Sequence, residues 1–251
     1  MALFTDGNIA NLNDLRAYES SILDLAGTEG IDLGAKLSLA HRELEFEIVS
    51  FLLRRGQLSG AHRELDHVVV TDPMLHAHTM LALALIYRDA YNSQLNDRYE
   101  GKWKQYSELS RNAVRQLFEI GVGITYTPLP RPQPPVPELL LGGFRQATTY
   151  AVRVALTGTA GYMGALSDAS IIPATPGVTL QITLGDASAG TTGWVLFVSD
   201  GDGPLQRQNE QPLAPGTVWT CPSDGIRMDL ADLVGQGPDY YVVNRKELLR
   251  G

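Results

Sequence analysis

The run PLPRPQPPVP, residues 128–137, contains six prolines in ten positions and separates two segments of different character. Proline restricts φ and has no amide hydrogen, so this run is not expected in a helix or in a central strand. A polyproline II conformation is expected instead, with a length of about 30 Å at roughly 3.1 Å per residue. The run predicts a semi-rigid linker over residues 126–138, between a domain of residues 1–125 and a domain of residues 139–251.

The segment before the prolines has apolar residues at three- and four-residue spacing, which is typical of amphipathic helices. About four helices are predicted, over residues 14–26, 35–55, 73–91 and 96–121. The third is apolar on every side from Met80 to Tyr87 and is therefore expected at the centre. Helices of this length joined by short turns predict an all-α helical bundle.

The segment after the prolines consists of short Val-, Thr- and Leu-rich runs separated by Gly, Pro and Asp clusters. Strands are predicted over residues 148–157, 178–184, 193–199, 205–208, 218–221 and 240–243. The DGDG sequence at 200–203 predicts a hairpin turn, because Asp-Gly supplies the positive φ that such turns require. Short strands without intervening helices predict an antiparallel β-sandwich of the fibronectin III or immunoglobulin-like type, with Trp194 in its core. The fold class expected for the whole chain is α+β in two domains.

The chain carries a net charge of −8, divided as −5 over residues 1–125 and −3 over residues 126–251. Neither half has the excess of Lys and Arg that drives tight nucleic-acid binding through counterion release. The single Cys221 excludes an intramolecular disulfide framework and is expected to fill apolar space. No secretory signal is evident at the N-terminus, and the longest apolar run is far shorter than the roughly 20 residues that a bilayer requires. A protein without a membrane span, made in a reducing cytoplasm, is expected.

The five histidines are the first candidates for catalysis or metal binding. Two pairs are closely spaced, His76 with His78 and His62 with His67. These separations place the members of each pair on different helix faces. His41 and Glu45 lie four apart and could share a metal ion, but two ligands are weak evidence for a site. Structural or surface roles are therefore expected for all five histidines.

The other sequence patterns that could indicate catalysis or metal binding are equally weak evidence. Glu43 and Glu47 lie on an exposed helix face, without the apolar burial that raises the pKa of a general acid. The DGDG sequence lacks the further oxygen ligands of a calcium loop, so a turn is expected. No G-x-S-x-G, H-E-x-x-H, Walker A or G-x-G-x-x-G motif occurs. The sequence predicts no catalytic residue, no metal site and no cofactor, and hence a protein that is not an enzyme.

One motif matches a recognition pattern. Arg131, Pro134 and Pro137 form R-x-x-P-x-x-P, a sequence that aromatic grooves bind as polyproline II. A proline-rich linker that contains an arginine matches this pattern easily. The linker interpretation is preferred, and the recognition role is the alternative.

The stretch ALALIYRDAYNSQLNDRYEGKWKQYSELSRNAVRQLFEIGVGI, residues 82–124, resembles the two long helices of head–tail connector (adaptor) proteins of tailed bacteriophages. In that family the pattern L-YRD…ND-Y--K---Y---A closes a small helical bundle. Residues 150–221 resemble the fibronectin-like modules that are appended to virion proteins. A proline-linked β module is not part of the smallest connectors, which leaves its role open.

The resemblance implies a structural virion protein located in the neck, at the head–tail interface, and made in the host cytoplasm. Such a subunit forms a ring, with about twelve copies expected, that contacts the portal protein and tail or stopper proteins. DNA would then be only passing cargo, and the acidic balance of the chain agrees with a ring lumen that weakly repels phosphate.

The last residues, YYVVNRKELLRG over 240–251, combine an apolar strand with a basic and apolar tail. Two leucines have little reason to be exposed, so the tail is expected to reach a neighbouring subunit or partner. The predicted contact residues are Arg245, Lys246, Leu248, Leu249 and Arg250. The alternative is a frayed end.

A different class of function remains open. In a bacterial binding or adhesion module, the sandwich would recognise carbohydrate or protein, and the helical domain would only oligomerise. Exposed aromatic side chains on the sandwich, such as Tyr162 or Trp219, would favour this function. A buried Trp219 would count against it.

Overall fold

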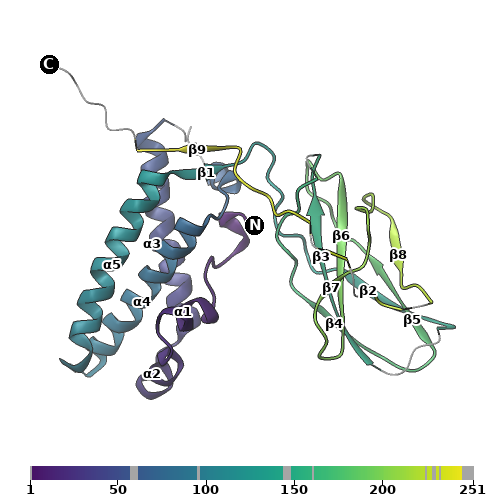
Figure 1. Cartoon of the computed structure of the whole chain (residues 1–251), viewed down its shortest axis with the longest axis horizontal. Helices are drawn as coiled ribbons and strands as arrows, with labels where there is room; N and C mark the ends of the chain where they lie inside the picture. Colours follow the sequence, from purple (N-terminus) through teal and green to yellow (C-terminus); the bar gives the residue numbers. More distant parts are fainter. Residues whose placement is uncertain are drawn as a thin grey trace. The chain divides into compact units, whose positions relative to one another are not determined.

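The computed structural model describes residues 2–56, 62–94, 97–143, 148–159, 161–223, 225–227, 230–231 and 233–244. The chain forms two compact units, one helical and one built of β-strands (Figure 1). The β unit comprises Met1–Asp6 and Tyr126–Gly237, and the helical unit comprises Gly7–Thr125 and Pro238–Gly251. The predicted α+β layout in two parts is confirmed. The predicted boundaries are wrong at both ends of the chain, because each terminal segment belongs to the unit that is remote from it in sequence.

The described part of the helical unit contains five α-helices. They are α1 (Leu12–Tyr18), α2 (Ile22–Glu29), α3 (Leu33–Arg54), α4 (Asp72–Gln94) and α5 (Glu100–Ile120), with short 3-10 segments η2 (His62–His67) and η3 (Asp97–Tyr99). A further 3-10 segment, η1 (Phe4–Asp6), belongs to the β unit. The last three α-helices agree with the predicted ranges to within a few residues.

The first predicted helix is wrong, because α1 and α2 are separate. Asn11 caps α1, and its side chain and that of Asp14 form a reciprocal capping box. Glu19 ends α1 in an extended conformation, and its carboxylate accepts hydrogen bonds from elsewhere in the unit. The break is therefore stabilised by tertiary contacts, which helical periodicity does not reveal.

The helix α4 packs against both α3 and α5, as its apolar sequence predicts. Pro73 is the second residue of α4, in the first turn, where the missing amide hydrogen would have had no partner within the helix. Lys36, near the start of α3, forms an ion pair of 2.7 Å with Asp89, near the end of α4. The Tyr91 ring near the end of α4 stacks on Trp103 near the start of α5. These contacts show that α3 and α5 both run antiparallel to α4 and so point in the same direction.

A two-stranded antiparallel sheet completes the helical unit. Strand β1 (Val122–Ile124) follows α5 directly, and β9 (Tyr240–Val242) pairs with it. The sequence prediction had placed this last strand in the sandwich, which is wrong. Gly123 permits the pairing, because a Cβ atom there would lie only 2.8 Å from Cβ of Pro238.

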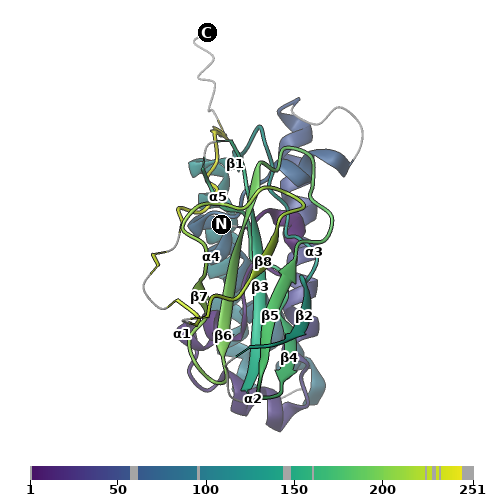
Figure 2. The same cartoon turned by 90° about the vertical axis from the view of Figure 1, so that its right-hand side faces the viewer.

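The described residues of the β unit form two antiparallel sheets. One has the strand order β2 (Val136–Leu141), β5 (Val178–Thr183) and β8 (Val218–Thr220). The other has the order β4 (Ser170–Ala174), β3 (Thr148–Thr157), β6 (Gly193–Asp200) and β7 (Gln206–Arg207). The strands of both sheets can be followed in Figure 2. The predicted hairpin at DGDG is confirmed by the antiparallel pairing of β6 with β7.

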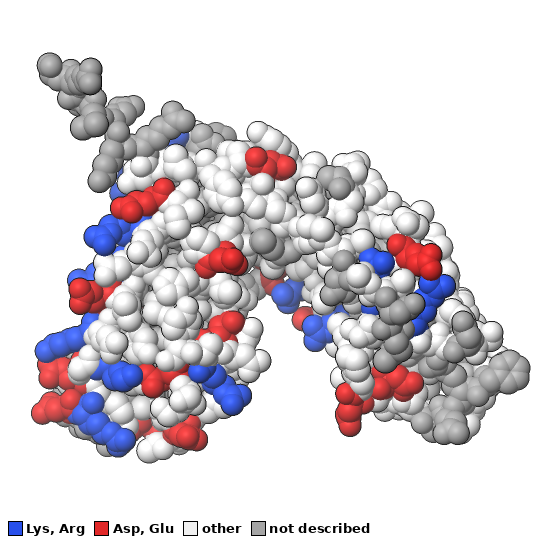
Figure 3. Space-filling view, in the orientation of Figure 1, with Lys and Arg blue, Asp and Glu red and all other residues white. Residues whose placement is uncertain are grey.

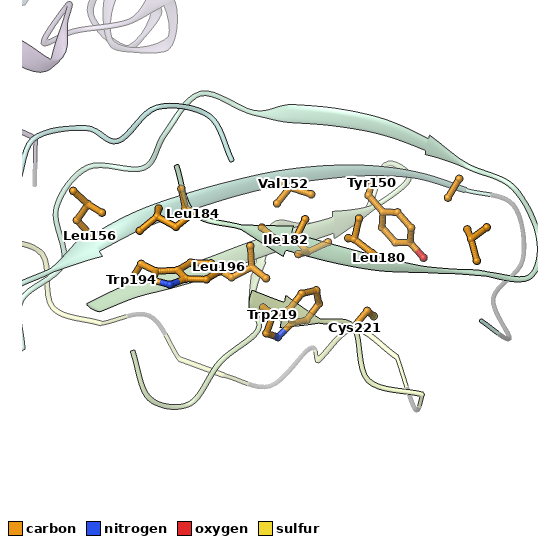
Figure 4. Packing of buried hydrophobic residues seen from close by; sticks show 14 of the residues in the cluster. Tyr150, Val152, Leu156, Leu180, Ile182, Leu184, Trp194, Leu196, Trp219 and Cys221 are labelled. Carbon is orange, nitrogen blue, oxygen red and sulfur yellow. The ribbon is translucent and has the colours of Figure 1, made fainter. Parts of the chain in front are cut away.

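An apolar core is shared by both sheets (Figure 4). Its labelled members are Tyr150, Val152, Leu156, Leu180, Ile182, Leu184, Trp194, Leu196, Trp219 and Cys221. Trp194 is fully buried and donates a hydrogen bond of 3.2 Å to the carbonyl of Ala214, so its predicted core position is confirmed. Cys221 is buried in the same cluster, as expected for a small apolar side chain.

The proline-rich run belongs to the β unit and is not an independent linker. Leu129 is buried in the shared core, and its amide donates to the side chain of Gln236 at 2.9 Å. Pro137 lies within β2, opposite Ile182 of β5. Because β2 is an edge strand, it tolerates a residue without an amide hydrogen. The prediction that the run avoids central strands holds, whereas the linker over residues 126–138 is wrong.

Candidate interaction groove on the helical unit

An open groove of about 650 Å³ lies on the helical unit. Its walls come from α3 and α5, and Leu81 of α4 contributes to its floor. We call it the α3–α5 groove. The apolar side chains that line it are Phe46, Leu81, Val114 and Phe118, and the charged ones are Glu43, Glu47, Arg54, Arg111 and Arg115.

Phe46 is the most unusual side chain of the groove, because 73% of its surface is exposed. The buried stripe of α3 runs through Leu37, Ala40, Leu44, Ile48 and Phe51. Phe46 lies off this stripe, so the fold of the unit gives it no apolar partner surface comparable to its size. Complete burial of a phenylalanine is favourable by about 2–3 kcal/mol, and Phe46 has gained little of this free energy. An exposed aromatic side chain in a groove is typical of a contact surface.

Over most of the groove the two walls carry opposite charges, while Arg54 adds a cation to the α3 wall at the end beyond Phe51. Glu43 and Glu47, here called the acidic row, lie one turn apart on α3, and Arg111 and Arg115, the basic row, lie one turn apart on α5. Both arginines are held along their own helix, since Arg111 Nε donates to the Ser107 carbonyl and Arg115 donates to the side chain of Asn112. Among the described residues, no ion pair joins the two rows across the groove. Figure 3 shows side chains of both charges on the surface of the helical unit.

Near one end of the groove the two helices are joined by aromatic stacking. The rings of Phe51 on α3 and Phe118 on α5 lie 4.5 Å apart and nearly parallel. The backbone N–H of Asn244, which follows β9, donates to the carbonyl of Phe118 at 3.0 Å. The side-chain oxygen of Asn244 accepts a hydrogen bond from Arg55. These contacts hold the ends of α3 and α5 together and leave the remainder of the groove open.

The histidines have structural partners. His78 is fully buried, its Nε2 donates to the Leu37 carbonyl at 3.1 Å, and its Nδ1 accepts from the amide of Ala10 at 3.2 Å. Burial lowers the pKa of His78 to about 4, so the ring is neutral at pH 7. The ring of His41 lies 6.0 Å from that of His78, a proximity that their separation in sequence did not predict. Burial also lowers the pKa of His41.

The remaining histidines do not converge on a metal site. His76 lies 3.0 Å from the hydroxyl of Tyr18, and His67 lies 2.7 Å from the carbonyl of Thr125. The side chain of His62 lies outside the described residues. In the part of the chain that the structure describes, no group of three or more His, Cys, Asp or Glu side chains could hold a metal ion.

A polar cluster around Glu19 anchors the turn between α1 and α2. Its carboxylate accepts hydrogen bonds from Lys102 Nζ at 2.6 Å and from the Tyr106 hydroxyl at 3.1 Å. Burial opposes the charge of Glu19, but the hydrogen bonds from Lys102 and Tyr106 outweigh it and lower the pKa of the carboxyl group. Burial, together with the nearby carboxylate, raises the pKa of Tyr106 to about 12. The cluster explains the helix break and is structural in character.

The residues predicted as partner contacts, Arg245, Lys246, Leu248, Leu249 and Arg250, all lie outside the described residues. The aromatic residues proposed for an adhesion surface have different environments: Tyr162 is 45% exposed, whereas Trp219 is buried in the sandwich core. A buried Trp219 counts against the adhesion function. In the R-x-x-P-x-x-P motif, Pro137 is part of a paired strand, and Arg131 forms an ion pair of 3.5 Å with Asp168.

Sequence reasoning identified Glu43 and Glu47 as a solvated pair and did not identify the groove. The available signal was Phe46, an aromatic residue between two acidic ones on a helix face that was expected to be polar. The arginines on α5 also had the spacing of neighbours on one face. No local pattern shows that these two faces flank a common groove, because that depends on how both helices pack on α4.

No protein-family model matches this chain, and no curated protein sequence matches it. None of the helices in the described ranges is long and apolar enough to cross a membrane.

Proposed function

We propose that this chain is a structural subunit of a tailed-bacteriophage particle, a head–tail connector (adaptor) that acts by docking to other proteins. The observation that carries the proposal is the α3–α5 groove, in which exposed Phe46 lies beside the acidic row of α3 and the basic row lies on α5. Such a surface provides apolar area for affinity and charges for orientation, which are the features of a protein interface. The identification with connectors rests on the resemblance of residues 82–124, which form most of α4 and α5.

The β unit is proposed to be an immunoglobulin-like or fibronectin-like module appended to the connector. Two observations support this type of sandwich. Consecutive strands β3 and β4, and again β6 and β7, pair within one sheet, while β2, β5 and β8 form the other. The shared core is built around Trp194 without a disulfide, as in fibronectin-like domains. The module would decorate the particle or contact tail components.

The proposed assembly is a ring in the virion neck, with about twelve copies, bound to the portal protein on one side and to tail or stopper proteins on the other. DNA passes through such a ring without specific binding, in agreement with the net charge of −8. No catalytic step, cofactor or metal is proposed.

The decisive experiment measures the molar mass of the complex that the chain forms with the portal protein. The full chain is purified, mixed with the portal protein encoded in the same genome, and examined by light scattering after size exclusion and by negative-stain electron microscopy. A ring-shaped complex on the portal is expected. A chain that neither binds the portal nor forms a closed oligomer would overturn the connector assignment.

A further inference from the structure

The α3–α5 groove is complementary to itself. We infer that a second copy of this chain binds it groove to groove, related by a two-fold axis that runs parallel to α3 and α5. The inference concerns the helical unit alone and does not depend on the bacteriophage assignment. It goes beyond the proposed ring, which requires a separate, heterologous surface.

The first step of the argument is the position of the charges along the groove. Helices α3 and α5 point in the same direction, and the stack of Phe51 on Phe118 sets both at a common height. At a rise of 1.5 Å per residue, the acidic row lies about 6 and 12 Å from Phe51 along α3. On α5 the basic row lies about 4.5 and 10.5 Å from Phe118. The two rows are therefore level with each other to within about 2 Å.

The second step is the symmetry. A two-fold axis parallel to the groove places α3 of one copy opposite α5 of the other, at the same height. Glu43 then lies opposite Arg111 of the second copy and Glu47 opposite its Arg115, and the symmetry repeats both pairs. An axis across the groove would instead place α3 opposite α3, so that like charges meet. The charges therefore favour the parallel axis.

The third step concerns the apolar floor. In the parallel arrangement the exposed Phe46 side chains of both copies lie between the charge rows and face the groove of the other copy. Val114 and Leu81, which are half-buried in one chain, provide the surface they cover. This contact would bury the aromatic surface that the isolated chain leaves in water. An aromatic contact at the centre with charged pairs at the edge is the usual arrangement of a protein–protein interface.

Charge exchange tests the inference. Sedimentation velocity is measured on the full chain, on the variant Glu43→Arg/Glu47→Arg, on the variant Arg111→Glu/Arg115→Glu, and on an equimolar mixture of the two. Each variant alone should dimerise at least about tenfold more weakly than the natural chain, because like charges then face each other. The mixture should recover a dimer, because its basic groove meets an acidic one.

A matched control changes two acidic residues elsewhere on the helical unit. Asp24→Arg/Asp97→Arg alters the net charge as Glu43→Arg/Glu47→Arg does, at exposed positions that do not line the groove, and should leave dimerisation unchanged. Circular dichroism confirms that every variant is folded. Because all changes lie on exposed or half-buried side chains, loss of the fold is not expected.

Three results would overturn the inference. The first is a natural chain that stays monomeric at about 200 µM, and the second is a dimer that is indifferent to both charge reversals. The third is a chain that dimerises only after residues 245–251 are removed, since its own C-terminal segment would then be the occupant of the groove. Each result leaves the connector assignment to be decided by portal binding, so the two failures are distinguishable.

Discussion

Acidification should destabilise the helical unit through a single buried histidine. His78 has no exposed surface and forms hydrogen bonds to Leu37 and Ala10 in its neutral form. Burial is the main reason for its low pKa; the Leu37 carbonyl and Asp14 act in the opposite direction, and His41 lowers the pKa further. Protonation would add a second N–H where the Ala10 amide already donates, so the charged ring does not fit this site.

The size of the effect follows from the two pKa values. The folded pKa is about 4, whereas the value without the fold is 6.5, so the unfolded chain binds the proton first. Stability is therefore complete above pH 6.5 and is lost as the pH falls toward 4. The difference between the two pKa values corresponds to about 3 kcal/mol in the free energy of unfolding.

The assay compares the natural chain with His78→Gln, whose amide can both donate and accept but does not titrate. Urea unfolding is followed by circular dichroism at 222 nm, which reports on the helical unit, at several pH values from about 7.5 to 4. The free energy of unfolding of the natural chain minus that of the variant should fall by about 3 kcal/mol across this range. The other titrating groups are common to both proteins and cancel in the difference, apart from the coupling of His41 to His78.

A difference that stays constant with pH, or that grows on acidification, would refute the reasoning. Titration of His78 near pH 6.5 in a proton NMR experiment on the folded chain would refute it as well. Either result would mean that the ring is charged in the folded protein and that its hydrogen bonds differ from those described.

The remaining predictions concern packing. Phe46→Ala should change the free energy of unfolding by less than about 0.5 kcal/mol, because the side chain is exposed, whereas Leu44→Ala, at a fully buried position, should cost about 2–5 kcal/mol in urea unfolding. Gly123→Ala should disrupt the pairing of β1 with β9, since its Cβ would collide with Pro238, and hydrogen exchange should show loss of protection in both strands. Gly27→Ala, in α2 with open space around it, should instead raise stability by about 0.5–1 kcal/mol.

Each of these comparisons has an outcome that contradicts it. Equal costs for Phe46→Ala and Leu44→Ala would mean that Phe46 is packed in the isolated chain. Unchanged exchange protection in Gly123→Ala would mean that β9 does not lie against β1. A destabilised Gly27→Ala variant would show that this helix position is strained.

Periodicity alone predicted the long elements of this chain. The buried positions of α3 repeat every three or four residues, and β5 alternates strictly, so each pattern reflects one surface of one element. The central position of α4 was also predictable, because a helix that is apolar on all sides must be covered on all sides. The hairpin at DGDG followed from the conformational freedom of glycine, which is a local property.

The remaining features were decided by contacts between residues far apart in sequence. Strand β9 pairs with β1 across more than 100 residues, and the proline-rich run places Leu129 in the core of the β unit, although its composition indicated a semi-rigid linker. The α3–α5 groove likewise exists only because α3 and α5 both pack against α4 and meet at Phe51 and Phe118. Local sequence determines which surfaces an element has, whereas the partner of each surface depends on the burial of apolar area by the whole chain. That choice is made by tertiary structure.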